Sequence, residues 1–278
     1  MGGAYLAAMF VDQVSAIIRE VGAVEVVPRF RALAEGDVME KSPGDLVTIA
    51  DQECERVLAE RLQRVRDIPV VGEEGTAADP TLLDLVGSAD ATWIIDPIDG
   101  THNFAHGKPP FGIIIARSEG GLCTSGWIYD CLTGRFCSAH SGQGAFLNGE
   151  QVTAKPAGRD KPVAAISMLF LTPDQQDMVN RTIAPHYDLV DIPRCAAEQY
   201  PRLALGENDV SSFKRTLPWD HAAGILWLNE AGGKAARLDD TPYRVDEADK
   251  PEDRRGLVGA SSPQIWNEFI ARVRANAS

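Results

Sequence analysis

The stretch Trp93-Ile94-Ile95-Asp96-Pro97-Ile98-Asp99-Gly100-Thr101-His102-Asn103-Phe104 decides how this sequence folds. Aromatic and β-branched residues precede Asp96, which predicts a buried strand. Pro97 and the Asp99-Gly100 pair then predict a turn that leads into a helix at Thr101. Two acids three residues apart can therefore point at one spot, although an isolated Asp-Gly pair is more often a simple turn.

The helix predicted to begin at Thr101 would place an anion-binding group beside these acids. The backbone N–H groups of Gly100 and Thr101 would lie at a helix N-terminus, which binds anions. Carboxylates that hold a cation beside N–H groups that hold a phosphate are what metal-assisted phosphoryl transfer requires. A second predicted strand, residues 68–72, also ends in acids, Glu73-Glu74. We therefore expect carboxylates from two strand ends to form one site.

The overall charge of the chain is acidic. The 278 residues carry a formal net charge of -13, which argues against nucleic acid or an anionic membrane as the main partner. The charge fits a solvated acidic surface or acids that converge in a cation site, and composition does not separate the two. No apolar run approaches the roughly 18 residues that span a bilayer. Five cysteines without metal-ligand spacing predict a reduced, cytoplasmic protein.

The first half of the chain is predicted to combine helices with an antiparallel sheet. Apolar residues recur at helical spacing over residues 6–21, and Thr48 with Asp51 resembles a capping box before a second helix. Residues 37–44 are predicted as a loop or hairpin. The sheet is predicted from strands at residues 68–72, 91–96, 111–117, 122–129 and 134–139.

The second half of the chain is predicted to alternate helices and strands, which is typical of an α/β arrangement. It follows a predicted linker at residues 156–162. The predicted strands are residues 163–170, 189–192 and 257–260. The predicted helices are residues 172–183, a run from Trp219 that ends at Gly232-Gly233, and residues 264–274.

Four stretches together resemble the inositol monophosphatase family of Mg²⁺-dependent, lithium-sensitive phosphatases. They are Lys41-Ser42-Pro43-Gly44-Asp45-Leu46-Val47-Thr48-Ile49-Ala50-Asp51, Val71-Gly72-Glu73-Glu74, residues 93–104, and Pro218-Trp219-Asp220-His221-Ala222-Ala223-Gly224. They occur in the family's order and with similar spacing over nearly the whole chain. The motif at residues 93–104 is highly specific.

The resemblance implies an α+β fold, a layered α-β-α-β-α sandwich of the sugar-phosphatase type with an antiparallel sheet in the first half and an α/β second half. Residues 1–155 would form an α+β subdomain that carries most metal ligands. Residues 156–278 would form an α/β subdomain that carries Asp220 and the substrate rim. The active site would lie in the cleft between them, and the protein would be a homodimer.

The resemblance also implies the metal ligands. Glu73, Asp96 and the Ile98 carbonyl would hold one Mg²⁺. Asp96, Asp99 and Asp220 would hold a second, and Glu73 would reach a weaker third ion through water. Two metals about 3.5–4 Å apart can stabilise both the attacking and the leaving oxygen. Oxygen ligands suit Mg²⁺, and the lack of a His/Cys cluster argues against zinc.

The same resemblance implies which residues activate water and bind substrate. Thr101, hydrogen-bonded to Asp51 and assisted by Glu73, resembles the family's water-activating pair, whereas each residue taken alone would be read as a helix cap. Lys41 is expected beside the site as a counter-charge rather than as a catalyst, and the alternative is a solvated loop lysine. His221, on an apolar helix face, is expected to be a packed core histidine, and His102 is not a family ligand. The predicted substrate contacts are Asp99, Gly100, Thr101, Arg194, Arg215 and Asp220.

Two departures from the family pattern concern the substrate. Phe213 stands where inositol-preferring members have an acid that reads sugar hydroxyls, and Arg194 is followed by Cys195 rather than by the family's Gly-Ser/Thr-Ala-Ala. Inositol specificity is therefore not implied. Lys214 and Arg215 suggest a substrate with a second anionic group, such as a sugar bisphosphate. The alternative is that both are solvated surface residues.

The leading hypothesis is Mg²⁺-dependent hydrolysis of a small phosphorylated metabolite by a metal-activated water. Fructose 1,6-bisphosphate, histidinol phosphate and 3′-phosphoadenosine nucleotides are alternative substrates, because relatives on the same fold process them and a fold does not choose a substrate. A different class of function is regulatory binding to the transcription machinery, as in some relatives. Intact acids at the metal positions favour catalysis.

Overall fold

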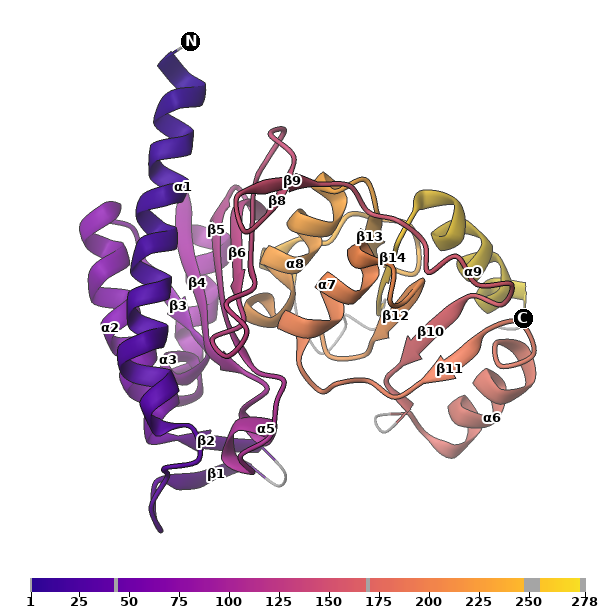
Figure 1. The fold of residues 1–278 in the computed structure, drawn as a ribbon, viewed down its shortest axis with the longest axis horizontal. Coiled ribbons are helices and arrows are strands. Elements are labelled where there is room, and N and C mark those ends of the chain that lie inside the picture. The colour runs from indigo at the N-terminus through magenta and orange to yellow at the C-terminus, as the bar shows by residue number, and fades with distance from the viewer. Residues whose placement is uncertain (1, 43–44, 169–170, 248–255, 276–278) are drawn as a thin grey trace.

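The protein is a layered sandwich in the computed structural model, which describes residues 2–42, 45–168, 171–247 and 256–275. Figure 1 shows its layers in the order α-β-α-β-α, which confirms the predicted fold class. From one side to the other they are helices α1 (Gly2–Val21) and α2 (Ile49–Val65), a seven-stranded sheet, helices α7 (Ala196–Leu205) and α8 (Pro218–Glu230), a five-stranded sheet, and helices α6 (Pro173–Thr182) and α9 (Pro263–Ala275).

The first sheet has the strand order β3-β4-β5-β6-β7-β8-β9. Its strands are β3 (Val70–Gly72), β4 (Ala91–Asp99), β5 (Gly112–Glu119), β6 (Leu122–Tyr129), β7 (Phe136–His140), β8 (Ala145–Leu147) and β9 (Glu150–Val152). Neighbours are antiparallel as predicted, except that β3 and β4 are parallel. A crossover through α3 (Glu73–Ala78), Pro80–Asp84 and α4 (Leu85–Ser88) explains this exception, because it returns the chain in the same direction.

The second sheet has the strand order β11-β10-β12-β14-β13 and is mixed. Strands β11, β10 and β12 are parallel, whereas β14 is antiparallel to both β12 and β13. The strands are β10 (Val163–Ile166), β11 (Asp188–Val190), β12 (Val210–Phe213), β13 (Lys234–Ala236) and β14 (Leu257–Ala260). The predicted strand at residues 163–170 is thus shorter, and residues 169–170 lie outside the described residues.

The remaining elements are short. A hairpin of β1 (Val38–Ser42) and β2 (Asp45–Thr48) forms the predicted loop or hairpin, of which residues 43–44 lie outside the described residues. Helix α5 (Thr101–Ala105) begins at the predicted residue, and helical turns occur at Gly22–Val26, Val27–Arg29 and Val245–Glu247. Within the described ranges, no helix combines the length and the apolar character that a bilayer crossing requires.

Successive side chains of β4 point alternately into the cores on the two faces of the first sheet. Trp93 and Ile95 are buried in the core beneath α1 and α2, whereas Ile94 between them is buried against α7 and α8. A strand that is buried on both faces has a continuous apolar sequence, and residues 93–95 have one. The next residue, Asp96, continues the alternation and faces the side of α8.

A β-bulge in β4 brings the second acid to the same face. Asp96 pairs with Ile114 and Asp99 with Gly112, so β4 has one more residue in this interval than β5. The extra residue resets the alternation, because an odd spacing in a regular strand would send the two side chains to opposite faces. Ile98 is therefore buried with the α1–α2 core, and Asp99 shares the face of Asp96.

Close packing between α8 and β6 sets the height of α8 above the sheet. A Cβ atom on Gly126 of β6 would lie 2.8 Å from the Ala223 Cα atom and 3.0 Å from its Cβ atom. Ala223 is one helical turn after Asp220, so this contact also sets how far Asp220 stands from the acids of β4.

We predict that Gly126→Ala destabilises the fold by about 1–3 kcal/mol, because α8 would have to move away from the sheet. Urea unfolding measures the effect. Gly87→Ala in α4 is the control, since its Cβ atom would meet only the Asp246 side chain, at 3.3 Å, and we expect a change within about 0.5 kcal/mol. Equal stability of both variants and the parent would show that the contact at Gly126 does not constrain α8.

Candidate active site

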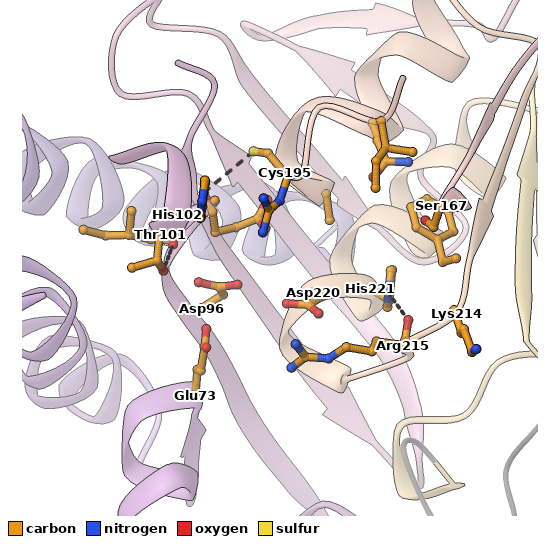
Figure 2. A pocket seen from close by; sticks show the side chains of 18 of the residues that line it. Glu73, Asp96, Thr101, His102, Ser167, Cys195, Lys214, Arg215, Asp220 and His221 are labelled. Carbon is orange, nitrogen blue, oxygen red and sulfur yellow. Dashed lines mark hydrogen bonds between the residues drawn. The ribbon is translucent and has the colours of Figure 1, made fainter. Parts of the chain in front are cut away.

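A cleft of about 220 Å³ opens where the ends of β4 and α8 meet. Its walls come from both halves of the chain (Figure 2). The lining residues are Leu46, Glu73, Asp96, Ile98, Asp99, Gly100, Thr101, His102, Ser167, Ile192, Arg194, Cys195, Ala196, Gln199, Phe213, Lys214, Arg215, Asp220 and His221. Asp51, the one remaining predicted site residue, lies buried behind Thr101.

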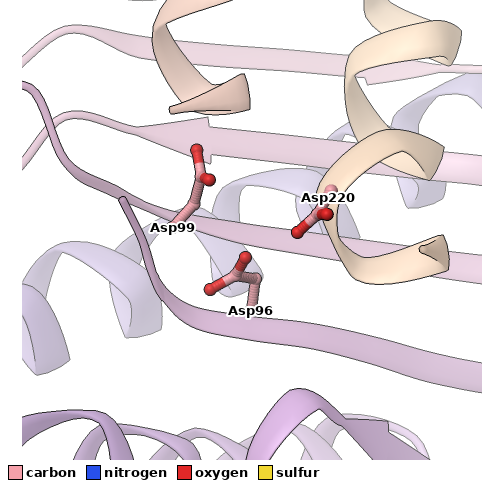
Figure 3. A group of neighbouring side chains, drawn as sticks. All are labelled: Asp96, Asp99 and Asp220. Carbon is pink, nitrogen blue, oxygen red and sulfur yellow. The ribbon is translucent and has the colours of Figure 1, made fainter. Parts of the chain in front are cut away.

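Three carboxylates converge at the floor of the cleft. Figure 3 shows Asp96 and Asp99 of β4 turned toward Asp220 from the first turn of α8. One oxygen from each lies within 4.8 Å of the other two. Asp96 is 1% exposed, and its Oδ1 atom has no hydrogen-bond partner among the described residues. A buried carboxylate oxygen without a donor is the expected arrangement for a cation ligand.

The electrostatics of this group favour a bound cation. Burial, together with the charge of Glu73, raises the pKa of Asp96 well above its usual range. Burial and the neighbouring Asp99 do the same to the pKa of Asp220. Like charges packed this closely resist ionisation unless a positive charge joins them. The residues therefore fit a divalent metal, and an all-oxygen donor set suits Mg²⁺.

Asp99 is anchored to the other half of the chain. Its Oδ2 atom accepts a hydrogen bond from the Ala197 N–H at 2.5 Å, in the first turn of α7. Burial raises the pKa of Asp99 to about 6, although the N–H groups of α7 favour its charged form. This bond links β4 directly to the second half of the molecule.

Glu73 lies beside Asp96 and is held by Lys41. Figure 2 shows the two carboxylates pointing toward one another. Glu73 is not part of the group within 4.8 Å, and its Oε1 atom accepts a hydrogen bond from Lys41 Nζ at 2.8 Å. Lys41 also bonds Glu74 at 2.9 Å, so the structure places Lys41 as the predicted counter-charge. Burial and the charge of Glu73 raise the pKa of Glu74 to about 8.

Glu55 lies outside the cleft lining but contacts the segment that follows Glu73, a role that was not predicted from the sequence. Its carboxylate accepts the N–H groups of Glu74 and Gly75 at 2.8 and 2.7 Å, at the start of α3. Glu55 is four residues after Asp51 on α2, so both face the same way. That spacing is the signal that could have found it.

Thr101 and Asp51 form the hydrogen bond expected from the sequence. Thr101 Oγ1 lies 3.0 Å from Asp51 Oδ1 and 2.9 Å from the Ile98 carbonyl oxygen. Asp51 Oδ2 accepts the Thr48 N–H and hydroxyl groups, which forms the predicted capping box of α2. Burial raises the pKa of Asp51 to about 6, against the hydrogen bonds from Thr48 and Thr101.

Gly100 connects the acids to α5 in a conformation that favours glycine. Its φ is +86°, and a Cβ atom there would lie 2.9 Å from the Pro110 carbonyl oxygen. The sharp turn presents the first N–H groups of α5 beside Asp99, and such groups lack partners within the helix.

The rim of the cleft comes from connecting segments. Arg194 precedes α7 and has a φ of +55°, which is uncommon for a residue other than glycine. Lys214 and Arg215 follow β12 and are exposed. His221 is buried and bonded to the Tyr200 hydroxyl and the Arg215 carbonyl, which agrees with the predicted core histidine. His102 is half-buried and contacts His106 with tilted rings whose centroids lie 4.4 Å apart.

A model of the inositol monophosphatase family matches residues 11–278. The inositol-1-monophosphatase of Mycobacterium leprae is 32% identical over 256 residues, which cover 87% of this chain and 83% of the relative. A Thermotoga maritima protein named fructose-1,6-bisphosphatase/inositol-1-monophosphatase is 31% identical over 267 residues, which cover 92% and 95%.

Solved structures agree in fold over nearly the whole chain. The extragenic suppressor protein suhB of Bartonella henselae superposes with a TM-score of 0.76 at 23% identity, covering 96% of this chain and 98% of that one. A Thermotoga maritima IMPase superposes with a TM-score of 0.75 at 25% identity, covering 94% and 95%. The match at residues 11–278 and the identity to curated relatives, at similar length, confirm the resemblance first seen in four motifs. The chain belongs to the inositol monophosphatase family of phosphoric monoester hydrolases.

Proposed function

We propose that this chain hydrolyses a small phosphomonoester with Mg²⁺ held by Glu73, Asp96, the Ile98 carbonyl, Asp99 and Asp220. The observation that carries the proposal is the convergence of three carboxylates around an Asp96 oxygen that has no donor among the described residues. When bound, two or three ions would polarise the phosphoryl group and lower the pKa of a water molecule.

Thr101 and Asp51 would orient and deprotonate the attacking water. A hydroxyl has one proton to donate. If Thr101 gives it to Asp51 Oδ1, at 3.0 Å, the Thr101 lone pairs remain free to accept a proton from water in the cleft. Asp51, whose pKa burial raises to about 6, can take up the relayed proton. Glu73, at the cleft wall, would assist.

Gly100 and Thr101 would place the phosphoryl group. The first N–H groups of α5 have no carbonyl partners within the helix and stand beside Asp99. Asp99, Gly100, Thr101 and Asp220 line the cleft together and would contact the phosphate or its leaving oxygen. Arg194 and Arg215 on the rim would contact the rest of the substrate.

Two observations bear on which phosphomonoester the protein hydrolyses. Phe213 is buried and offers no carboxylate to sugar hydroxyls, and one relative is named for both fructose-1,6-bisphosphatase and inositol-1-monophosphatase activity. A phosphate-release screen with Mg²⁺ over sugar, inositol, amino-alcohol and nucleotide phosphates would identify the substrate. Absence of release from every compound would refute the proposal. We also expect lithium inhibition, a homodimer and a cytoplasmic location.

Asp96→Asn is expected to lower kcat/KM at least about a thousandfold, because it removes a charge that both ions would share.

Thermal melting gives a second readout of the same variant. Mg²⁺ should raise the melting temperature of the parent but not of Asp96→Asn. In EDTA the variant should melt no lower than the parent, since burial raises the pKa of Asp96 and the neutral acid carries the same charge as the amide. Asp67→Asn, an exposed acid outside the cleft, is the control. Near-normal turnover in Asp96→Asn would show that the site is misassigned.

Thr101→Val should lower kcat about 10²–10⁴-fold with little change in KM, because valine has the shape of threonine without the hydroxyl. Thr101→Ser keeps the hydroxyl and should retain most activity. Steady-state kinetics at saturating Mg²⁺ measures both variants. A Thr101→Val enzyme within a few-fold of the parent would remove Thr101 from the proton path.

Glu55→Gln should raise the Mg²⁺ concentration for half-maximal activity about tenfold. Each Glu55 oxygen accepts one N–H group, from Glu74 or from Gly75, and the amide replaces one of these acceptors with an NH₂ donor, which loosens the segment that carries Glu73. Activity at saturating Mg²⁺ should fall less. Glu53→Gln is the matched control on the same helix, where Glu53 pairs only with exposed Arg56. An unchanged Mg²⁺ requirement in Glu55→Gln would mean that Glu55 does not position the ligand.

A further inference from the structure

The first turn of α7 is where the second half of the chain contacts Asp99. Ala197 donates its N–H group to Asp99 Oδ2 at 2.5 Å. The Ala197 side chain lies over Gly112, the register partner of Asp99 in β5, where a Cβ atom would be only 3.0 Å from the Ala197 Cβ atom. The position of this turn therefore decides how the Asp99 carboxylate is presented to the other two acids.

A side chain from the first half binds this turn where the helix lacks a hydrogen bond of its own. Pro201 has no N–H group to donate to the Ala197 carbonyl four residues earlier. Arg135, in the turn between β6 and β7, donates to that carbonyl at 3.4 Å instead. The same guanidinium nitrogen also donates to the carboxylate of Glu198, the next residue of α7. Arg135 thus holds α7 by a backbone group and a side chain together.

The turn that carries Arg135 is closed by its own hydrogen bonds. The Asp130 N–H group donates to the Arg135 carbonyl at 2.9 Å, and the Asp130 carboxylate accepts the N–H groups of Leu132 and Thr133 at 2.9 and 3.1 Å. Only 20% of the Arg135 side chain and 12% of the Glu198 side chain are exposed. A shielded ion pair on such a turn keeps one geometry, whereas an exposed pair is screened by water and contributes little.

The other arginine on Glu198 has a different role. Arg202 bonds the second Glu198 oxygen at 2.7 Å from within α7, and its further partner, Glu207, also belongs to the second half. Arg202 therefore stabilises the helix without connecting it to the first half. Asn103 of α5 does connect the two halves, because it donates to the Pro193 carbonyl at 3.0 Å just before α7. Arg135 adds a charged link to the first turn itself.

We infer that Arg135 is a positioning residue for Mg²⁺ binding: together with Glu198 it holds the first turn of α7 against Asp99, so that the Asp99 carboxylate stays in place for the cation. Arg135 lies outside the cleft lining and acts through Ala197. The inference rests on the proposed function, because it assumes that Asp99 is a Mg²⁺ ligand. Replacing a residue that orients a metal ligand typically weakens metal binding about 10–100-fold.

Arg135→Met removes the charge and the donors but keeps a long, flexible side chain. It should raise the Mg²⁺ concentration for half-maximal activity about tenfold, with a smaller loss of kcat at saturating Mg²⁺. Calorimetric titration with Mg²⁺ alone should show the same shift in Kd. Arg135→Lys keeps the charge beside Glu198 and should restore part of the affinity. Arg202→Met is the matched control on the same carboxylate, and its Mg²⁺ affinity should stay within about twofold of the parent.

A second variant tests whether the two residues act as one pair. Glu198→Gln should also weaken Mg²⁺ binding, and the double variant with Arg135→Met should lose less than the sum of the two single losses. Additive losses would mean that the pair does not act as a unit. The melting temperature in EDTA measures the stability of each variant separately from its Mg²⁺ affinity.

The outcomes separate this inference from the proposed function. If Arg135→Met melts lower in EDTA but binds Mg²⁺ as the parent does, Arg135 only stabilises the fold and the inference is wrong. An equal loss of Mg²⁺ affinity in Arg202→Met would also overturn it, because the link between the halves would then not matter. A parent that binds no Mg²⁺ would overturn both the inference and the metal assignment. Normal Mg²⁺ binding without phosphate release from any compound would refute the hydrolytic function alone.

Discussion

The bulge between Asp96 and Asp99 is the constraint on which the site depends. Strand geometry sends residues three apart to opposite faces, and only the extra residue in β4 turns both carboxylates toward α8. Pro97 is tolerated there because it has no register partner on either side: β3 pairs only as far as Ile95, and the bulge leaves Pro97 unpaired with β5. The rest of the site is arranged around this turn.

Helix α2 supports both acidic strand ends from one face. Asp51 holds Thr101 after β4, and Glu55 holds the N–H groups that follow Glu73 after β3. Helix α8 brings Asp220 from the other side, at a height set by Gly126. Strand β4, the start of α3 and the first turn of α8 thus bring together carboxylates that repel one another. The buried cores beneath α1–α2 and around α7–α8 must supply the free energy that keeps them there.

The sequence predicted the parts of this arrangement that local pattern encodes. Residues 93–95, the capping box at Thr48 and the start of α5 are set by neighbours in the chain, and all agree with the structure. Helix α7 was not predicted. Pro201 in its interior would ordinarily break a helix, yet Arg135 donates a hydrogen bond to the Ala197 carbonyl that the proline leaves without its helical partner. The bulge and the contact of Asp99 with Ala197 depend on pairing between distant segments, which pattern alone does not reveal.

The acids that would hold the metal ions and the residues that would select the substrate lie on different kinds of structural element. Asp96, Asp99 and Asp220 stand on a buried strand and a buried helix, where a substitution disturbs both packing and charge. Arg194, Lys214 and Arg215 stand on segments that connect elements and are exposed. Such positions can change without moving the acids. The two departures from the family pattern, Phe213 and Cys195, are buried next to these exposed positions and line the same cleft. The surface that the substrate meets can therefore differ from the family pattern while the acids stay in place.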